Sequence, residues 1–344
     1  MKSLKDISWN VTEFEYRKDP ALSYSTLAKF EREGFNNLDK LFEPVETPSL
    51  TFGSAVDCLI TDGEAAFQDL FMVSDIPNME PAVEPIVKSV FEAFNNSYTN
   101  IMDIPDSSLM PIISQSAWQP RWKPETRCKA IREKGAQYYQ TMFMAKGKTI
   151  LTQDVYNRVF ACVRALKDSK QTHNYFCEDN PFDNVRRFYQ LKFKATLDGI
   201  DFRCMADLIV VDYDNKRIIP CDLKTSSHKE WDFYKSFCQW NYQIQARLYW
   251  RIIRENMDKD EFFKDFTLED YRFIVVNSND IPVPLVWKFE ETQKEGKLII
   301  GDNIMRDPFE IGKELSYYIQ EKPIVPQGIS ITSTNSISKW LERK

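Results

Sequence analysis

The 344-residue sequence contains little histidine, few glycines and no paired cysteines. Two histidines, His173 and His228, offer little material for a histidine-rich metal site or a Ser-His-Asp triad. The seven cysteines form no C-x-x-C pair, so their spacing excludes a thiolate zinc site or an iron–sulfur cluster and favours free thiols in a reducing cytosol. Ten glycines argue against a Gly-rich nucleotide-binding fold. What remains is chemistry based on carboxylates and lysine.

The sequence also lacks long apolar stretches and an excess of basic residues. No run approaches the ~18 apolar residues that span a bilayer, and the first twenty residues lack the apolar core of a secretion signal. We therefore expect a cytoplasmic protein without a membrane segment. The net charge of −6 excludes a generally basic surface for nucleic acid, although a local basic groove is compatible with it. Apolar residues make up 43%, enough for a sizeable core.

Hydrophobic periodicity predicts an α/β (α+β) fold with a mixed central sheet flanked by helices. Helices are expected over residues 21–33, 52–60, 152–168, 229–255 and 291–319. Strands are expected over residues 186–196, 201–213, 216–225, 271–277 and 283–289. Residues 74–125 contain seven prolines, which predicts loops and short helices wrapped around the core. Length alone suggests about two domains, and we divide the chain into an N-terminal helical elaboration, 1–150, and a core, 151–344.

The most informative geometry follows from the turn signal Asp214-Asn215. If these residues close a hairpin, Asp207 lies directly opposite Asp222, with Cβ atoms about 4.5–5.5 Å apart. Lys224 points to the same side as Asp222, and both strands are apolar enough to be buried on both faces.

Two carboxylates placed in this way repel each other unless a proton or a cation lies between them. Because all the ligands would be oxygens, the pair predicts a Mg²⁺ or Mn²⁺ site. A structural ion-pair network of Asp207, Asp222 and Lys224 is the alternative. Pro220 could also introduce a bulge that shifts the register.

Asp207 followed by C-D-L-K at 221–224 resembles the paired motif of the PD-(D/E)XK nuclease superfamily. Gln245 and Tyr249 add a Q-x-x-x-Y spacing similar to that of its RecB-like and RecE-like branches. The segments LSYSTLAKF, FGSAVDCLI and KGKTILTQDVYNRVFACVRAL follow the layout of phage RecE-type (exonuclease VIII) and lambda-exonuclease-like recombination nucleases. The resemblance covers about residues 21–62 and 145–325.

The resemblance implies a restriction-endonuclease-like core and a set of site residues. Metal ligands would be Asp57, Asp207, Asp222 and the backbone carbonyl of Leu223. Lys224 would orient or deprotonate the attacking water, or stabilise charge on the phosphate. Gln245 and Tyr249, one helical turn apart, would support the lysine or contact DNA, although Tyr249 could equally pack in the core. The family has histidine in place of Asp57 and glutamate in place of Gln190.

The resemblance further implies a Mg²⁺-dependent exonuclease on double-stranded DNA ends, 5′ to 3′, in phage-type recombination or replication. Expected partners are DNA, a single-strand annealing protein and further copies of the chain in a ring; a phage-encoded protein would act in the host cytoplasm. Arg186, Arg187, Gln190, Lys192 and Lys194 lie beside the site and are candidates for phosphate contacts or for a solvated strand face. The alternatives are a catalytically weakened DNA-binding or assembly module, and an endonuclease of the same fold.

Overall fold

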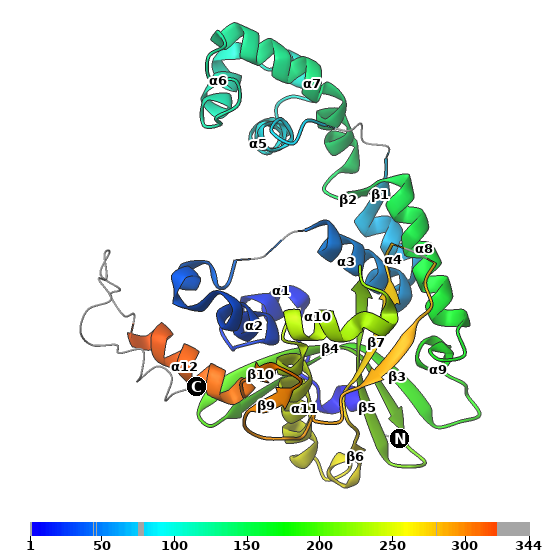
Figure 1. Ribbon diagram of the computed structural model, residues 1–344. Coiled ribbons are helices and arrows are strands. Elements are labelled where there is room, and N and C mark those ends of the chain that lie inside the picture. The colour runs from blue at the N-terminus through cyan, green and yellow to red at the C-terminus, as the bar shows by residue number, and fades with distance from the viewer. Residues whose placement is uncertain (1, 44, 46, 75–78, 280, 322–344) are drawn as a thin grey trace.

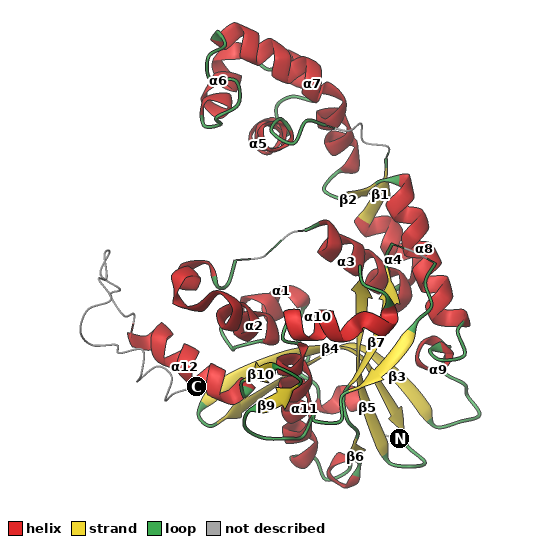
Figure 2. Cartoon of the chain, in the orientation of Figure 1, coloured by secondary structure: helices red, strands yellow, loops and turns green. Residues whose placement is uncertain are grey.

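The computed structural model describes residues 2–43, 45, 47–74, 79–279 and 281–321. At its centre is a mixed sheet with the strand order β3-β4-β5-β7-β8, and β6 pairs with β5. The strands are β3 (Val185–Leu197), β4 (Ile200–Asp212), β5 (Arg217–Ser226), β6 (Thr267–Leu268), β7 (Arg272–Asn277) and β8 (Leu285–Lys288). The β5–β7 and β5–β6 pairs are parallel and the other pairs are antiparallel. The predicted mixed α/β architecture is confirmed (Figures 1 and 2).

Helices cover both faces of the sheet and divide its core into two buried clusters. One cluster contains α2 (Tyr24–Glu33), α10 (Phe233–Gln239), α11 (Tyr242–Asp258) and α12 (Pro308–Glu321). The other contains α3 (Pro48–Thr61), α4 (Gly63–Leu70), α8 (Gln153–Asp168) and α9 (His173–Phe176). The side chain of Thr152 caps α8, accepting a hydrogen bond from the N–H of Val155. The first 40 residues add η1 (Leu4–Ile7), α1 (Glu13–Lys18) and η2 (Gly34–Lys40).

The predicted register between β4 and β5 is confirmed, although the loop differs. The loop spans residues 213–216, and the ladder runs from Asp212 opposite Arg217 to Leu208 opposite Cys221. The loop is longer than the predicted 214–215 by one residue on each side. The two strands therefore keep the register that a two-residue loop would give. Pro220 causes no shift, because its missing N–H falls where β5 passes from β6 to β7, between Ile218 and Cys221.

The long helix expected over residues 229–255 is wrong. The segment forms η4 (Glu230–Asp232), α10 and α11, and Asn241 between the two helices has a φ of 54°. Asparagine adopts this left-handed conformation more readily than most residues do. The break turns the start of α11 towards β5.

The helix expected over residues 291–319 is wrong in its first half. A hairpin of β9 (Leu298–Ile300) and β10 (Asn303–Met305) precedes α12. Gly296 and Gly301 have φ values of 76° and 59°, which a helix does not accommodate. The C-terminal half of the prediction corresponds to α12.

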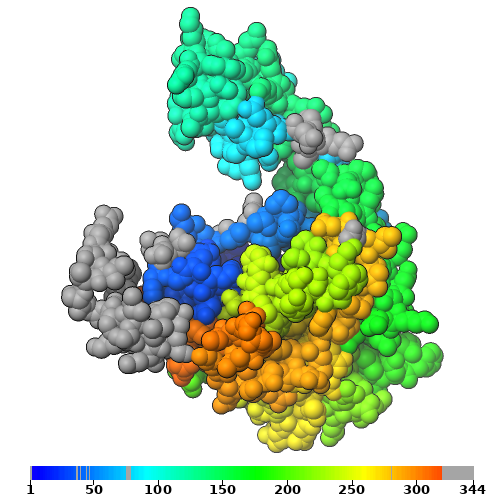
Figure 3. Space-filling view, in the orientation of Figure 1, coloured from blue at the N-terminus to red at the C-terminus, as the bar shows by residue number. Residues whose placement is uncertain are grey.

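Residues 79–146 form a helical unit with its own buried cluster. It contains α5 (Glu84–Phe94), η3 (Ile101–Asp103), α6 (Asp106–Ser114) and α7 (Pro124–Ala145). Short helices are therefore present as predicted, but they pack on one another instead of around the sheet. Figure 3 shows the unit, from cyan to green, standing away from the body and overhanging a broad open hollow. The division of the chain at residue 150 stays a prediction.

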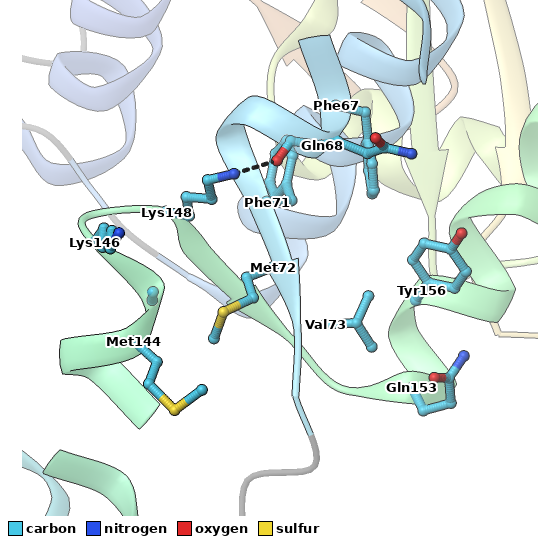
Figure 4. Close-up of a pocket in the computed structure, with 11 residues that line it drawn as sticks. Phe67, Gln68, Phe71, Met72, Val73, Met144, Lys146, Lys148, Gln153 and Tyr156 are labelled. Atoms are coloured by element: carbon cyan, nitrogen blue, oxygen red, sulfur yellow. Dashed lines mark hydrogen bonds between the residues drawn. The ribbon is translucent and has the colours of Figure 1, made fainter. Parts of the chain in front are cut away.

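A short parallel pair, β1 (Phe71–Val73) and β2 (Thr149–Leu151), connects the helical unit to α4 and α8. Beside it lies a hollow of about 620 Å³, lined among others by Phe67, Phe71 and Tyr156 (Figure 4). The Lys148 ammonium donates a hydrogen bond of 2.6 Å to the carbonyl of Gln68 at its edge. None of the predicted site residues lines this hollow. Among the described residues, no helix is long and apolar enough to cross a membrane.

Candidate active site

The two aspartates of the predicted pair lie where the sheet splits. The β4–β5 ladder ends at Leu208 opposite Cys221; beyond it, β4 stays paired with β3 and β5 with β7. Asp207 and Asp222 are the next residues on the two sides of this fork. The N–H of Leu223 donates a hydrogen bond of 3.0 Å to Asp207 Oδ2, and the Leu223 carbonyl points to the same side of its strand. The fork thus brings carboxylate and carbonyl oxygens together.

The side-chain alternation of β3 and β4 is interrupted at the same point. The β3–β4 pairing skips Gln190 and Asp207, and Gln190 has a φ of 52° inside its strand. On the α11 side, the buried residues are Phe188, Leu191, Phe193 and Ala195 in β3 and Phe202, Cys204, Ala206, Ile209 and Val211 in β4. The alternation therefore shifts by one residue across Gln190 in β3 and across Asp207 in β4. This irregularity leaves both polar side chains at the fork.

Asp57 reaches the fork from α3, on the opposite side of the sheet from α11. The helix comes close because residue 53 is a glycine, whose added Cβ would stand 3.2 Å from Thr225 Oγ1. Asp57 follows Gly53 by one helical turn and therefore lies on the same face. Its Oδ2 accepts a hydrogen bond of 2.8 Å from Gln190 Nε2. The close approach of α3 to β5 thus places a third carboxylate at the site.

Asp222 is 1% exposed and is held by two neighbours. Gln245 Nε2, from α11, donates a hydrogen bond to Asp222 Oδ1, and the Lys224 ammonium forms an ion pair with Oδ2. The same ammonium lies 4.6 Å from the centre of the Tyr242 ring. Asp222, Lys224 and Gln245 therefore form one buried, charge-assisted network.

Burial and neighbouring negative charge raise the pKa of two carboxyls at the fork. Loss of solvation, followed by the charge of Asp222, raises the pKa of Asp57 to about 7. Loss of solvation and the charges of Asp222 and Asp57 likewise raise the pKa of Asp207 well above its ordinary value. Burial disfavours the charged form of Lys224, but Asp222 and other neighbours outweigh it and raise the pKa of the ammonium. In the metal-free protein at neutral pH, Asp57 and Asp207 therefore tend to take up protons, which relieves the repulsion at the fork, while Lys224 stays a cation.

The donor set fits a hard divalent cation. Asp57 Oδ1 and Gln245 Oε1 are buried without a hydrogen-bond partner, and Asp222 Oδ2 contacts only the Lys224 ammonium. Carboxylate, amide and backbone oxygens are the ligands that Mg²⁺ prefers. Within the described ranges, however, no three His, Cys, Asp or Glu side chains are already grouped around one metal position. Lys224 and Gln190 each contact an oxygen that a cation would need, so binding would displace at least one of them.

The predicted basic residues are engaged in local contacts. Arg187 pairs with Asp179 and donates hydrogen bonds to the carbonyl of Asn174. Arg186 donates hydrogen bonds to the carbonyls of Asn180, Asp183 and Val185. Both arginines thus anchor the loop before β3. Their role in phosphate binding stays a prediction.

Lys192 and Lys194 follow Gln190 along β3. The Lys194 ammonium pairs with Asp19 at 2.9 Å and lies 5.3 Å from the Trp9 ring centre. The carbonyl of Lys192 accepts a hydrogen bond of 2.7 Å from the Trp9 N–H. The segment before α1 therefore packs along this stretch of β3, and phosphate contacts by the two lysines stay a prediction.

Of the two residues in the Q-x-x-x-Y spacing, only Gln245 contacts the acidic cluster directly. Tyr249 is 7% exposed and packs in the core, with its ring 6.2 Å from that of Tyr271. The tyrosine on Lys224 is Tyr242, which sequence reasoning missed. Its position depends on the break at Asn241, and no pattern in the sequence marked that break.

The pKa of Asp57 predicts how the metal-free protein responds to pH. Between about pH 4 and pH 7 the folded state binds more protons than the unfolded state, so this carboxyl's contribution to stability is present at low pH and lost as pH rises through 7. Asp57→Asn should therefore stabilise the protein at pH 8 by about 2 kcal/mol and have little effect at pH 5.

Urea unfolding in EDTA at both pH values measures this effect. Asp69→Asn, an exposed carboxylate of α4, is the matched control and should change stability at neither pH. Equal stability of Asp57→Asn and the wild type at pH 8 would contradict the proposed charge repulsion.

Comparison with known proteins does not assign the chain to a family. No family model matches the sequence, and no curated protein matches it. Among solved structures, the chain is similar to a crystal structure named "putative exonuclease" from Eubacterium rectale, with 12% sequence identity and a TM-score of 0.47. The similarity covers 96% of this chain and 98% of that chain.

Proposed function

We propose that the chain is a metal-dependent deoxyribonuclease that hydrolyses phosphodiester bonds at the ends of double-stranded DNA. The observation that carries the proposal is the convergence of Asp57, Asp207, Asp222 and Lys224 at the fork between β4 and β5. The site combines three carboxylates with one ammonium, and burial, followed by the charges of the neighbouring acids, raises the pKa values of Asp57 and Asp207.

This arrangement suits a phosphodiester substrate only with a cation. When ionised, three neighbouring carboxylates repel a phosphate, and a divalent cation would reverse the local field. The residues that would hold it are Asp57, Asp207, Asp222 and the Leu223 carbonyl. When bound, Mg²⁺ or Mn²⁺ polarises a phosphate oxygen and lowers the pKa of bound water.

The protein's own side chains have distinct roles in the proposal. Lys224 remains protonated because of its acidic neighbours, so it supplies positive charge to the phosphate instead of accepting a proton from water. Of the roles expected for it, orientation and charge stabilisation are retained. Gln245 fixes the orientation of the Asp222 carboxylate through its amide hydrogen bond and acts as a positioning residue.

The finer parts of the proposal are supported by the sequence resemblance. They are RecE-type and lambda-exonuclease-like activity, 5′-to-3′ polarity, a role in phage-type recombination, a ring of subunits and a single-strand annealing partner. A location in the cytoplasm, or in the host cytoplasm for a phage protein, belongs to the same set.

A DNA-binding or assembly module without catalysis is the second candidate. The Gln190 amide favours it, because it already donates to Asp57 Oδ2, where a metal or a water ligand would otherwise lie. An endonuclease of the same fold is distinguished by its cleavage of covalently closed circles.

Incubation of end-labelled linear duplex DNA with the protein and Mg²⁺ tests the proposal. We expect stepwise loss of nucleotides that stops in EDTA and resumes when excess Mg²⁺ is added. DNA binding without any hydrolysis in Mg²⁺ or Mn²⁺ would support the module instead, and cleavage of closed circles would support the endonuclease.

A further inference from the structure

The segment between β5 and α11 exposes an unusual number of aromatic rings. Trp231, Tyr234 and Trp240 are 59%, 56% and 42% exposed, and all lie within the ten residues 231–240, shortly after Lys224. Exposed aromatic rings that are grouped together, unlike single exposed rings, are typical of binding surfaces. We name Trp231, Tyr234 and Trp240 the aromatic platform.

The platform is rigidly supported from beneath. Glu230 is 2% exposed, and its Oε1 accepts hydrogen bonds from the N–H groups of Asn277 and Val283, at 3.0 and 2.8 Å. On α10, Phe233 and Phe237 face inwards and are buried in the core. The exposed rings thus extend from a backbone that is fixed on its other side.

Cationic groups lie on the faces of two of these rings. The Lys235 ammonium is 5.8 Å from the centre of the Tyr234 ring, and the Arg32 guanidinium is 5.2 Å from that of Trp240. Exposed aromatic faces interleaved with cations match the chemistry of single-stranded nucleic acid, because bases stack on the rings while phosphates pair with the cations.

A short series of contacts connects the platform to the fork. The Tyr24 hydroxyl donates a hydrogen bond of 2.8 Å to the Trp240 carbonyl, and the Tyr24 ring lies 6.1 Å from that of Tyr242. Tyr242 in turn lies against the Lys224 ammonium. In Figure 1, α10 lies beside α2, across the front of the sheet.

We propose that the aromatic platform binds unpaired nucleobases next to the site of phosphodiester hydrolysis. The inference rests on the proposed function and narrows its substrate to DNA whose end is single-stranded or has been melted. Bases in an intact duplex hide their faces in the stack, so only unpaired bases can stack on exposed rings.

Binding measured without catalysis tests the platform separately from the nuclease proposal. Fluorescence anisotropy in EDTA would follow a labelled 20-nucleotide oligothymidine with the wild type and with the Trp231→Ala/Tyr234→Ala double variant. We expect the double variant to bind about 30-fold or more weakly, given the contribution of each stacked base. The Trp231→Phe/Tyr234→Phe variant keeps both rings and should bind within about threefold of the wild type.

Two controls decide between stacking and a general loss of affinity. Phe182→Ala removes a ring that is 95% exposed elsewhere and should leave oligothymidine binding unchanged. A relaxed, covalently closed circular duplex, which has neither free ends nor unpaired loop bases, should lose little affinity in the alanine double variant. Wild-type affinity of that variant for oligothymidine, or an equal loss on the closed circle, would overturn the platform and favour a protein-docking surface. Absence of hydrolysis by the wild type would overturn only the nuclease proposal.

Discussion

Asp222→Asn is expected to lower Mg²⁺-dependent hydrolysis of linear DNA by about 1,000-fold or more. The substitution keeps the shape of a side chain that is 1% exposed and can still accept the hydrogen bond from Gln245. It removes the negative charge that holds the Lys224 ammonium and that would bind the cation. Loss of activity would therefore report on charge and not on packing.

The measurement is the release of nucleotides from labelled duplex DNA by equal amounts of folded protein, with circular dichroism to verify the fold. Asp265→Asn, an exposed carboxylate in η5 (Phe263–Asp265), is the matched control and should retain wild-type activity. Activity of Asp222→Asn within tenfold of the wild type would refute the assignment of this cluster as the catalytic site.

Lys224→Met is expected to separate metal binding from catalysis. Methionine keeps the apolar stem but removes the ammonium that contacts Asp222 Oδ2. Because that ammonium competes for an oxygen that the cation needs, we expect the variant to bind Mn²⁺ more tightly than the wild type. Hydrolysis should nevertheless fall about 100-fold, because the positive charge at the phosphate is lost.

The same substitution has a predicted effect on stability. Removing one partner of a buried ion pair leaves the carboxylate uncompensated, so the metal-free variant should be less stable by about 3 kcal/mol. Saturating Mn²⁺ should restore most of this loss, because the ion replaces the ammonium as the partner of Asp222. Calorimetric titration and thermal unfolding measure the two effects.

The matched control for this variant is Lys259→Met, which removes an ammonium that is 63% exposed and pairs with Glu255 on the surface. It should change neither Mn²⁺ affinity nor hydrolysis. Weaker Mn²⁺ binding by Lys224→Met would contradict the competition between the ammonium and the cation.

The strand register that leads to the fork could be predicted from the sequence, because it depends on a local turn signal and on the alternation of side chains along a strand. A turn signal and strand alternation predicted the β4–β5 register, and the ladder from Asp212 to Leu208 confirms that register although the loop is longer than expected. The helices over residues 21–33 and 152–168 were predictable for a similar reason, since both combine helical periodicity with a polar residue at the start.

The features that escaped prediction depend on tertiary contacts. Asn241 interrupts a pattern that predicts one continuous helix, and after this break Tyr242 lies against Lys224. Gln190 adopts a left-handed conformation in a strand whose sequence alternates regularly. In both cases the local sequence permits several conformations, and contacts with distant residues select one of them.

The central claim is that the fork between β4 and β5 binds a divalent cation for phosphodiester hydrolysis. Anomalous diffraction from crystals soaked in Mn²⁺ tests it most directly. We expect a peak at the fork, about 2.1 Å from carboxylate oxygens of Asp207 and Asp222 and beside Asp57, with the Lys224 ammonium moved off Asp222 Oδ2. A map without a peak at the fork, with Lys224 still paired to Asp222 at saturating Mn²⁺, would contradict it.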